Sequence, residues 1–173
     1  MKLLVVPDIH EDLVFLQSIL SEEDLDSFDH VVLLGDYFDP RGILNPDLDN
    51  LRRVAETLLS VKQQLGERLH MLCGNHDLPY YALRPVCRVG SGKPNTVIAQ
   101  WLESTTLERA EIINDVWDDL FWRNLKGAVL LDGWLFSHAG IHPDYWPKGL
   151  SGPLDAYERF QQHWRDAMAT LFG

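Results

Sequence analysis

Three short runs of apolar residues most constrain the fold of this chain. They span residues 3–6, 31–34 and 69–73, with His70 the one polar residue among them, and each run breaks abruptly into residues that favour turns or carry polar side chains. Continuous rather than alternating hydrophobicity is typical of strands that are buried on both faces, as in parallel sheets. Apolar residues at helical spacing between the runs predict helices over 12–20 and 51–65. This alternation predicts an α/β fold with a largely parallel sheet.

The second half of the chain is expected to add a helix, a hairpin and a final helix. Thr105 followed by Glu108 fits a capping box at the start of a third helix. The dipeptide Asp132-Gly133 joins two apolar runs, which indicates a tight β-hairpin. Apolar residues at helical spacing over 157–171 predict the last helix.

No repeat or interdomain linker interrupts the chain. Residues 39–50 and 78–100 are rich in turn-forming residues and are expected to be irregular. A length of 173 residues is typical of one domain, so residues 1–173 are predicted to form a single domain.

Composition narrows the class of protein and its partners. The net charge of −11 disfavours nucleic acid as a partner, because acidic surfaces repel phosphates, and favours sites that hold divalent cations. No apolar run approaches the length of a membrane-spanning helix, so no membrane association is expected. The N-terminal apolar run is too short for a signal peptide, which makes a cytoplasmic location the expectation.

Polar residues that can bind a metal follow each buried run. Because the carboxyl ends of strands meet at one edge of an α/β sheet, we expect these side chains to converge. Taken alone, each has an ordinary explanation as a helix cap, a structural histidine or a turn residue. Four such groups in order favour a metal site instead, and their mixed nitrogen and oxygen donors suit Mn, Fe or Zn. The groups are Asp8 and His10; Gly35, Asp36 and Asp39; Gly74, Asn75, His76 and Asp77; and His138, Ala139 and Gly140.

These four groups resemble the motifs of the calcineurin-like metallophosphoesterases. The resemblance covers residues 4 to about 145, and the segments GDYFDPRG and SHAGIHPD are closest to the serine/threonine protein phosphatase branch. It implies a metallophosphoesterase-type α/β/β/α sandwich that binds two divalent ions, Mn²⁺ and/or Fe or Zn²⁺. By this resemblance Asp8 and His10 hold the first ion, Asp36 bridges the two, and Asn75 and His138 hold the second.

The resemblance also implies the chemistry. A carboxylate between two ions about 3.5 to 4 Å apart can give one oxygen to each, and the ions activate water as a bridging hydroxide. His76 would be the general acid for the leaving group, and Asp39 would orient its imidazole. Asp77 is expected to be structural and to cap the following turn.

Two departures from the family pattern lie close to the predicted site. The family usually has Gly after the first histidine, whereas Glu11 and Asp12 follow His10 here. We expect both acids to be solvated residues at a helix start. In the phosphatase branch an Arg directly follows the second Asp of the GD motif, but here Pro40 intervenes and displaces Arg41 by one position. Arg41 therefore either binds the substrate phosphate or forms a surface ion pair.

A third departure concerns the end of the chain. The family has a later Gly-His motif that completes the metal shell, and no Gly-His pair follows residue 140. His163 is expected to be a surface or packing residue, while His142 is a candidate to replace the missing ligand. We expect the C-terminal part of the second sheet to be missing, either because the natural protein is short or because a further portion is absent from this chain.

Residues 78–102 form a local cationic segment. They contain no acid, but they do contain Arg84, Arg88 and Lys93. The segment is either an ordinary solvated loop or a wall that attracts substrate phosphate. In the second interpretation Arg84 and Arg88 bind the substrate.

Three functions follow from these features. The first is metal-dependent hydrolysis of a phosphoester by a phosphomonoesterase or protein phosphatase-like enzyme. Its substrate would be a phosphorylated small molecule, a nucleotide or a phosphoprotein. The second is an impaired metallophosphoesterase fold that serves as a scaffold for a protein partner. The third, a nuclease or phosphodiesterase acting on nucleic acid, is disfavoured by the acidic charge.

Overall fold

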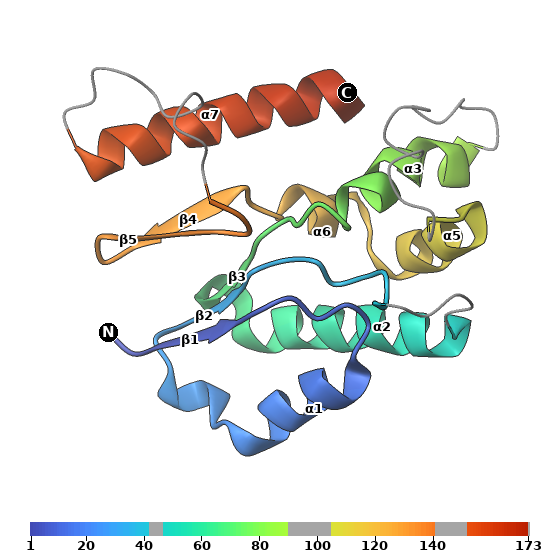
Figure 1. The fold of residues 1–173 in the computed structure, drawn as a ribbon, viewed down its shortest axis with the longest axis horizontal. Helices are drawn as coiled ribbons and strands as arrows, with labels where there is room; N and C mark the ends of the chain where they lie inside the picture. Colours follow the sequence, from blue (N-terminus) through green and yellow to red (C-terminus); the bar gives the residue numbers. More distant parts are fainter. Residues whose placement is uncertain (42–46, 90–104, 141–151, 173) are drawn as a thin grey trace.

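The computed structural model describes residues 1–41, 47–89, 105–140 and 152–172. Its first half is the predicted alternation of strands and helices (Figure 1). Strands β1, β2 and β3 pair in parallel in that order, with Val5 opposite Val32 and Val32 opposite His70. The elements are β1 (Leu3–Val6), α1 (Leu13–Glu22), a 3₁₀ turn (Leu25–Ser27), β2 (His30–Leu33), α2 (Leu48–Leu65), a 3₁₀ turn (Gly66–Arg68) and β3 (Leu69–Met71).

The second half adds helices, a hairpin and the last helix. The hairpin strands β4 and β5 are antiparallel, with Leu131 opposite Trp134, and Asp132 and Gly133 take positive φ in the turn between them. This is the two-residue turn that the Asp-Gly dipeptide predicts. The elements are α3 (Leu78–Val89), α5 (Leu107–Val116), α6 (Asp119–Arg123), β4 (Ala128–Leu131), β5 (Trp134–Ser137) and α7 (Pro153–Phe172).

The elements stack in layers that agree with the predicted α/β/β/α order (Figure 1). Successive side chains of a strand point to opposite faces of its sheet. Val31 and Leu33 accordingly join the large core on the helix side, whereas Val32 packs with Leu72 and Val129 between the two sheets.

Helix α7 covers the outer side of the hairpin. Gln161 Nε2 donates to the carbonyl of Ala128 (2.6 Å), and a Cβ on Gly127 would lie 2.7 Å from the Trp164 ring. Glycine at 127 therefore lets this helix approach β4 closely.

The helix starts show where local signals succeed and fail. Asp12, expected to be a solvated residue at a helix start, is exposed and caps α1, since its carboxylate accepts from Phe15 N–H (2.8 Å). Gly66, the residue after the predicted helix 51–65, ends α2 with φ of 56°. The predicted capping box is wrong, because Thr106 rather than Thr105 caps α5 by accepting from Arg109 N–H (3.2 Å). Apolar residues at helical spacing over 113–121 predict one continuous third helix, but the structure has two, because Asp118 caps a new helix, α6.

The prediction of irregular structure over 78–100 is wrong for its first part, where α3 forms. Pro79 lies in the first turn of this helix, where a missing N–H costs no hydrogen bond. Tyr80, Tyr81 and Leu83 then bury apolar surface in the core, which outweighs the weak local signal. Residues 90–100 lie outside the described ranges.

Aromatic side chains pack around Trp117 and hold the loop that follows β2. The Trp117 ring is fully buried and lies 4.9 Å from the Phe38 ring and 5.7 Å from the Tyr37 ring, centroid to centroid. Its indole N–H donates to the carbonyl of Ala55 (3.0 Å) on α2. Trp122 is also buried, whereas Trp134 is 70% exposed, so core packing accounts for part of the tryptophan content. In the described part of the chain, no helix is long and apolar enough to cross a membrane.

Candidate metal centre

The loops after β1 and β2 are tied together through their backbones. Ile9 N–H (3.0 Å) and His10 N–H (2.8 Å) both donate to the carbonyl of Asp36. His10, Glu11, Asp36 and Asp39 all take positive φ, between 46° and 66°, which is uncommon for residues other than glycine. Such strained residues cluster at functional sites, where surrounding contacts hold them in place.

Residues 36–39, which follow β2, direct two side chains into the core and two toward the site. Tyr37 and Phe38 are fully buried and pack against Trp117, and the Tyr37 hydroxyl donates to the carbonyl of Leu72 (2.8 Å). These two anchors place Asp36 and Asp39 on the opposite side of the loop, where their carboxylates meet the residues that follow β3.

Asp77 locks the loops after β2 and β3 to each other. It is fully buried, and its carboxylate accepts from the N–H groups of Asp36 (2.9 Å), Tyr37 (2.9 Å) and Gly74 (2.8 Å). Burial raises the pKa of Asp77 to about 7, although the backbone donors oppose this change. The residue is structural, as predicted, but its side chain joins two loops rather than capping the following turn.

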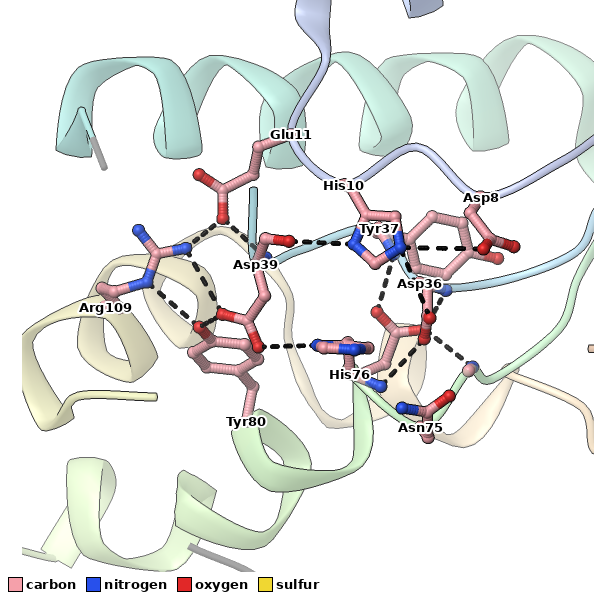
Figure 2. A network of polar contacts seen from close by, with 12 residues as sticks. Asp8, His10, Glu11, Asp36, Tyr37, Asp39, Asn75, His76, Tyr80 and Arg109 are labelled. Atoms are coloured by element: carbon pink, nitrogen blue, oxygen red, sulfur yellow. Dashed lines mark hydrogen bonds and ion pairs between the residues drawn. The ribbon is translucent and has the colours of Figure 1, made fainter. Parts of the chain in front are cut away.

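Three of the predicted ligands surround one point. The Nε2 atom of His10 lies 3.6 Å from Asp8 Oδ2 and 3.7 Å from Asp36 Oδ2. His10 Nδ1 lies 2.8 Å from the carbonyl of Asp39 and therefore carries the proton, which leaves Nε2 as an acceptor. This Nε2 atom is buried and has no hydrogen-bond partner in the described structure. A buried nitrogen facing two carboxylates fits a divalent cation (Figure 2).

A second donor set adjoins the first. The Nε2 atom of His138 lies 3.1 Å from Asn75 Oδ1 and 3.4 Å from Asp36 Oδ2. Its Nδ1 is held by the carbonyl of Leu34 (2.9 Å), so both histidines direct Nε2 inward. The oxygen Oδ2 of Asp36 is common to both sets, whereas Oδ1 accepts from His76 N–H (2.8 Å). One oxygen, rather than one for each ion as expected, therefore faces both imidazoles.

The electrostatics of this pair agree with its geometry. Contact with the Asp36 carboxylate raises the pKa of His138 to about 9, although burial opposes this. Burial also disfavours ionisation of Asp36, but His138 and the N–H of His76 outweigh that effect and lower the pKa of Asp36. The proton held by His138 thus stands where a cation would bind.

Comparison with known families agrees with this arrangement. A profile of the calcineurin-like phosphoesterases matches residues 1–168, which is nearly the whole chain. The chain belongs to the calcineurin-like phosphoesterase family. No curated protein matches it. Members of the family hydrolyse phosphoesters and typically bind divalent metals, and the Asp8, His10 and Asp36 group provides the donors for such an ion.

In this calcineurin-like phosphoesterase, His76 stands beside the two donor sets. Its imidazole Nδ1 lies 3.2 Å from Asp39 Oδ2, and its ring packs edge-on against His10 with centroids 5.1 Å apart. Asp39 is buried, whereas His76 is partly exposed. The carboxylate thus holds one side of the ring and leaves the other side free to meet a ligand.

The expectation that Glu11 is a solvated helix-start residue is wrong. Glu11 is 3% exposed, forms an ion pair with the buried Arg109 and accepts from Asp39 N–H (2.9 Å). Arg109 lies on α5, 98 residues further along the chain, so no local pattern links the two. The sequence signal for this ion pair was the acid at a position where the family usually has glycine, since a buried acid needs a cationic partner.

The predicted substrate residues occupy different environments. Arg41 is exposed and pairs with Asp8 Oδ2 (2.9 Å), at the edge of the first donor set. Arg84 lies in α3 rather than in a solvated loop, is 8% exposed, pairs with Asp119 (3.1 Å) and stacks on Tyr81. This position gives no support to phosphate binding by Arg84. His163 is exposed on α7, as expected. His142, Lys93 and the side chain of Arg88 lie outside the described residues.

Metal affinity is expected to depend on pH through His138. Because its pKa is raised to about 9, His138 is protonated at neutral pH in the metal-free protein and must lose that proton to bind a cation. Apparent affinity for Mn²⁺ should therefore fall about tenfold per unit as pH decreases from about 8 to about 6. Calorimetric titrations in two buffers of different ionisation enthalpy measure the accompanying proton release. A pH-independent affinity without proton release would contradict this assignment.

Proposed function

We propose that this protein is a phosphomonoesterase of the protein phosphatase-like type that uses two divalent cations. The proposal is supported most directly by Asp36, whose Oδ2 faces both His10 Nε2 (3.7 Å) and His138 Nε2 (3.4 Å). A carboxylate oxygen shared between two inward-facing imidazoles suits a pair of neighbouring cations better than a single one.

The residues present fit these cations. Asp8, His10 and Asp36 would hold the first, and Asp36, Asn75 and His138 the second, with Mn²⁺, Fe or Zn²⁺ matching the mixed donors. When bound, the cations would supply a water of lowered pKa and neutralise charge on phosphoryl oxygens. Asn75 contributes a neutral oxygen, which keeps the negative charge of the site low enough to accept an anionic ester.

His76 would deliver the proton to the leaving alkoxide. Its Nδ1 is held by Asp39 Oδ2 (3.2 Å), so its Nε2 is the atom available to the substrate. Asp39 would fix the ring orientation and stabilise its protonated form, as carboxylates do for catalytic histidines.

A cleft adjoins the first donor set on the side of Asp8 and His10. A cavity of about 850 Å³ is lined by Asp8, His10, Pro40 and Arg41, among others. Arg41 is exposed and its guanidinium reaches the edge of the donor set, so it is the candidate for binding a phosphate oxygen. In this role its ion pair with Asp8 would be exchanged for one with the substrate.

Hydrolysis of p-nitrophenyl phosphate tests the proposal. The protein should be inactive after treatment with a chelator and should regain turnover when Mn²⁺ is added, while Ca²⁺ should restore little activity because it prefers all-oxygen sites. Turnover that persists after chelation would contradict the proposal. A protein that binds Mn²⁺ but hydrolyses no phosphomonoester would also contradict it and would favour the scaffold hypothesis.

A further inference from the structure

Behind Asp39 lies a buried polar group that no catalytic role yet explains. It consists of Glu11, Tyr80 and Arg109, which come from three separate segments of the chain (Figure 2). All three are nearly inaccessible, with exposures of 3%, 0% and 2%. Arg109 contacts both Glu11 and Tyr80, these two residues contact Asp39, and Asp39 in turn contacts His76.

The direction of each hydrogen bond follows from the chemistry of the groups. A guanidinium only donates, so Arg109 Nε–H donates to the Tyr80 hydroxyl oxygen (3.0 Å). The hydroxyl proton is then directed to Asp39 Oδ1, to which Tyr80 donates. Burial raises the pKa of Tyr80 above its ordinary value, so this hydroxyl stays protonated and remains a donor. Asp39 Oδ2 is left to accept from His76 Nδ1 (3.2 Å).

Both ends of Asp39 are fixed by the same group. Its N–H donates to Glu11 Oε1 (2.9 Å), and Arg109 Nη2 pairs with that oxygen and lies 3.7 Å from Asp39 Oδ1. The backbone and the carboxylate of Asp39 are therefore held from one side. The remaining oxygen, Oδ2, points to His76.

The buried group, counted together with Asp39, carries one more negative charge than positive charge. Glu11 and Asp39 bring two negative charges and Arg109 brings one positive charge, so one negative charge is left over. The Asp39 carboxylate, which faces His76 Nδ1 (3.2 Å), is the acid of this group that Arg109 does not pair with closely. Arg109 offsets the charge of Glu11 and opposes the effect of burial, which raises the pKa of that acid.

Stability alone accounts poorly for this arrangement. A buried ion pair often stabilises a fold less than apolar residues of similar volume would, because both charges lose their hydration. Glu11 Oε2 and Arg109 Nη1 are also buried without a hydrogen-bond partner among the described residues.

We propose that Tyr80, Arg109 and Glu11 are positioning residues that hold the Asp39 carboxylate in line with His76 Nδ1. This inference rests on the proposed role of His76 as the proton donor. Without the Tyr80 hydroxyl, Asp39 Oδ1 loses its only hydrogen-bond donor among the described residues, and the carboxylate can rotate away from the imidazole. The proton would then be delivered from a poorly oriented ring.

Dependence on the leaving group separates this role from simple packing. Tyr80→Phe removes only the hydroxyl. It should lower kcat/KM for phenyl phosphate by about 10- to 100-fold, because phenoxide needs a proton when it leaves. The loss for p-nitrophenyl phosphate should be much smaller, because p-nitrophenoxide leaves readily without one. Arg109→Lys, which keeps the charge but loses the bond from Nε to Tyr80, should show the same contrast.

Tyr37→Phe is a matched control. Tyr37 is equally buried, and its hydroxyl donates to the carbonyl of Leu72 (2.8 Å) without touching Asp39. It should lower stability by about 1 kcal/mol, as loss of a buried hydrogen bond does, and change both substrates equally.

A spectroscopic measurement makes the test independent of turnover. In protein labelled with ¹⁵N-histidine, in both metal-free and Zn²⁺-loaded forms, the neutral His76 imidazole should show a single fixed Nδ1–H tautomer. Tyr80→Phe should shift it toward a mixture of tautomers, and a His76→Asn variant identifies the signals. Equal losses for both substrates with unchanged His76 signals would overturn the inference. If the wild type hydrolyses no ester, the proposed function fails, and the His76 signals alone then decide whether Tyr80 positions Asp39.

Discussion

Asp36→Asn should abolish tight binding of a cation pair and lower hydrolysis of p-nitrophenyl phosphate by at least about 100-fold. The carboxylate oxygen Oδ1 accepts from His76 N–H (2.8 Å), so the amide oxygen of asparagine is expected to keep that position. Its NH₂ group would then replace Oδ2 and face His10 Nε2 and His138 Nε2. A donor and a lost negative charge at the shared position oppose both cations.

Asp47→Asn is the matched control for this substitution. Asp47 is an exposed cap of α2 that accepts from Asp49 N–H (2.9 Å), and asparagine caps helices equally well. Calorimetric titration with Mn²⁺ should give wild-type stoichiometry for Asp47→Asn and greatly weakened binding for Asp36→Asn. Unchanged binding of both cations in Asp36→Asn, with the protein folded, would exclude Asp36 as the shared ligand.

His76→Asn should lower kcat for phenyl phosphate by about 100- to 10,000-fold while metal affinity changes far less. The imidazole contacts Asp39 through Nδ1, and its side chain belongs to neither donor set. Its N–H to Asp36 comes from the backbone, so the substitution retains that contact. The loss should therefore appear in the chemical step rather than in cation binding.

Steady-state kinetics with phenyl and p-nitrophenyl phosphate, beside Mn²⁺ titrations, separate the two effects. His163→Asn is the control, because His163 is exposed on α7. Loss of metal affinity in proportion to the loss of activity would identify His76 as a ligand. Near-normal turnover of phenyl phosphate would exclude it as the proton donor.

Local sequence patterns predicted much of the fold and the convergence of the site. The apolar runs gave the parallel strands because both faces of β2 are buried, by Val31 and Leu33 on one side and by Val32 on the other. Parallel strands end at one edge, so Asp8, Asp36 and Asn75 converge by topology alone. Helix α3 was missed because packing of Tyr80 and Leu83 outweighs the proline signal.

The residues behind the site could not be predicted in the same way. Glu11 meets Arg109 only after α5 packs against α2, and the two residues are 98 positions apart. The local pattern around Glu11 predicts solvated residues at a helix start. Asp12 is such a residue, whereas Glu11 is buried. The orientation of Asp36, with one oxygen toward both imidazoles, likewise depends on the His76 N–H and not on the motif.

Anomalous X-ray diffraction from crystals grown with Mn²⁺ tests the central claim most directly. The account predicts two manganese peaks about 3.5 to 4 Å apart. One should contact Asp8 and His10, the other Asn75 and His138, and both should contact Asp36. A single peak, or peaks that avoid the ends of the four strands, would contradict it.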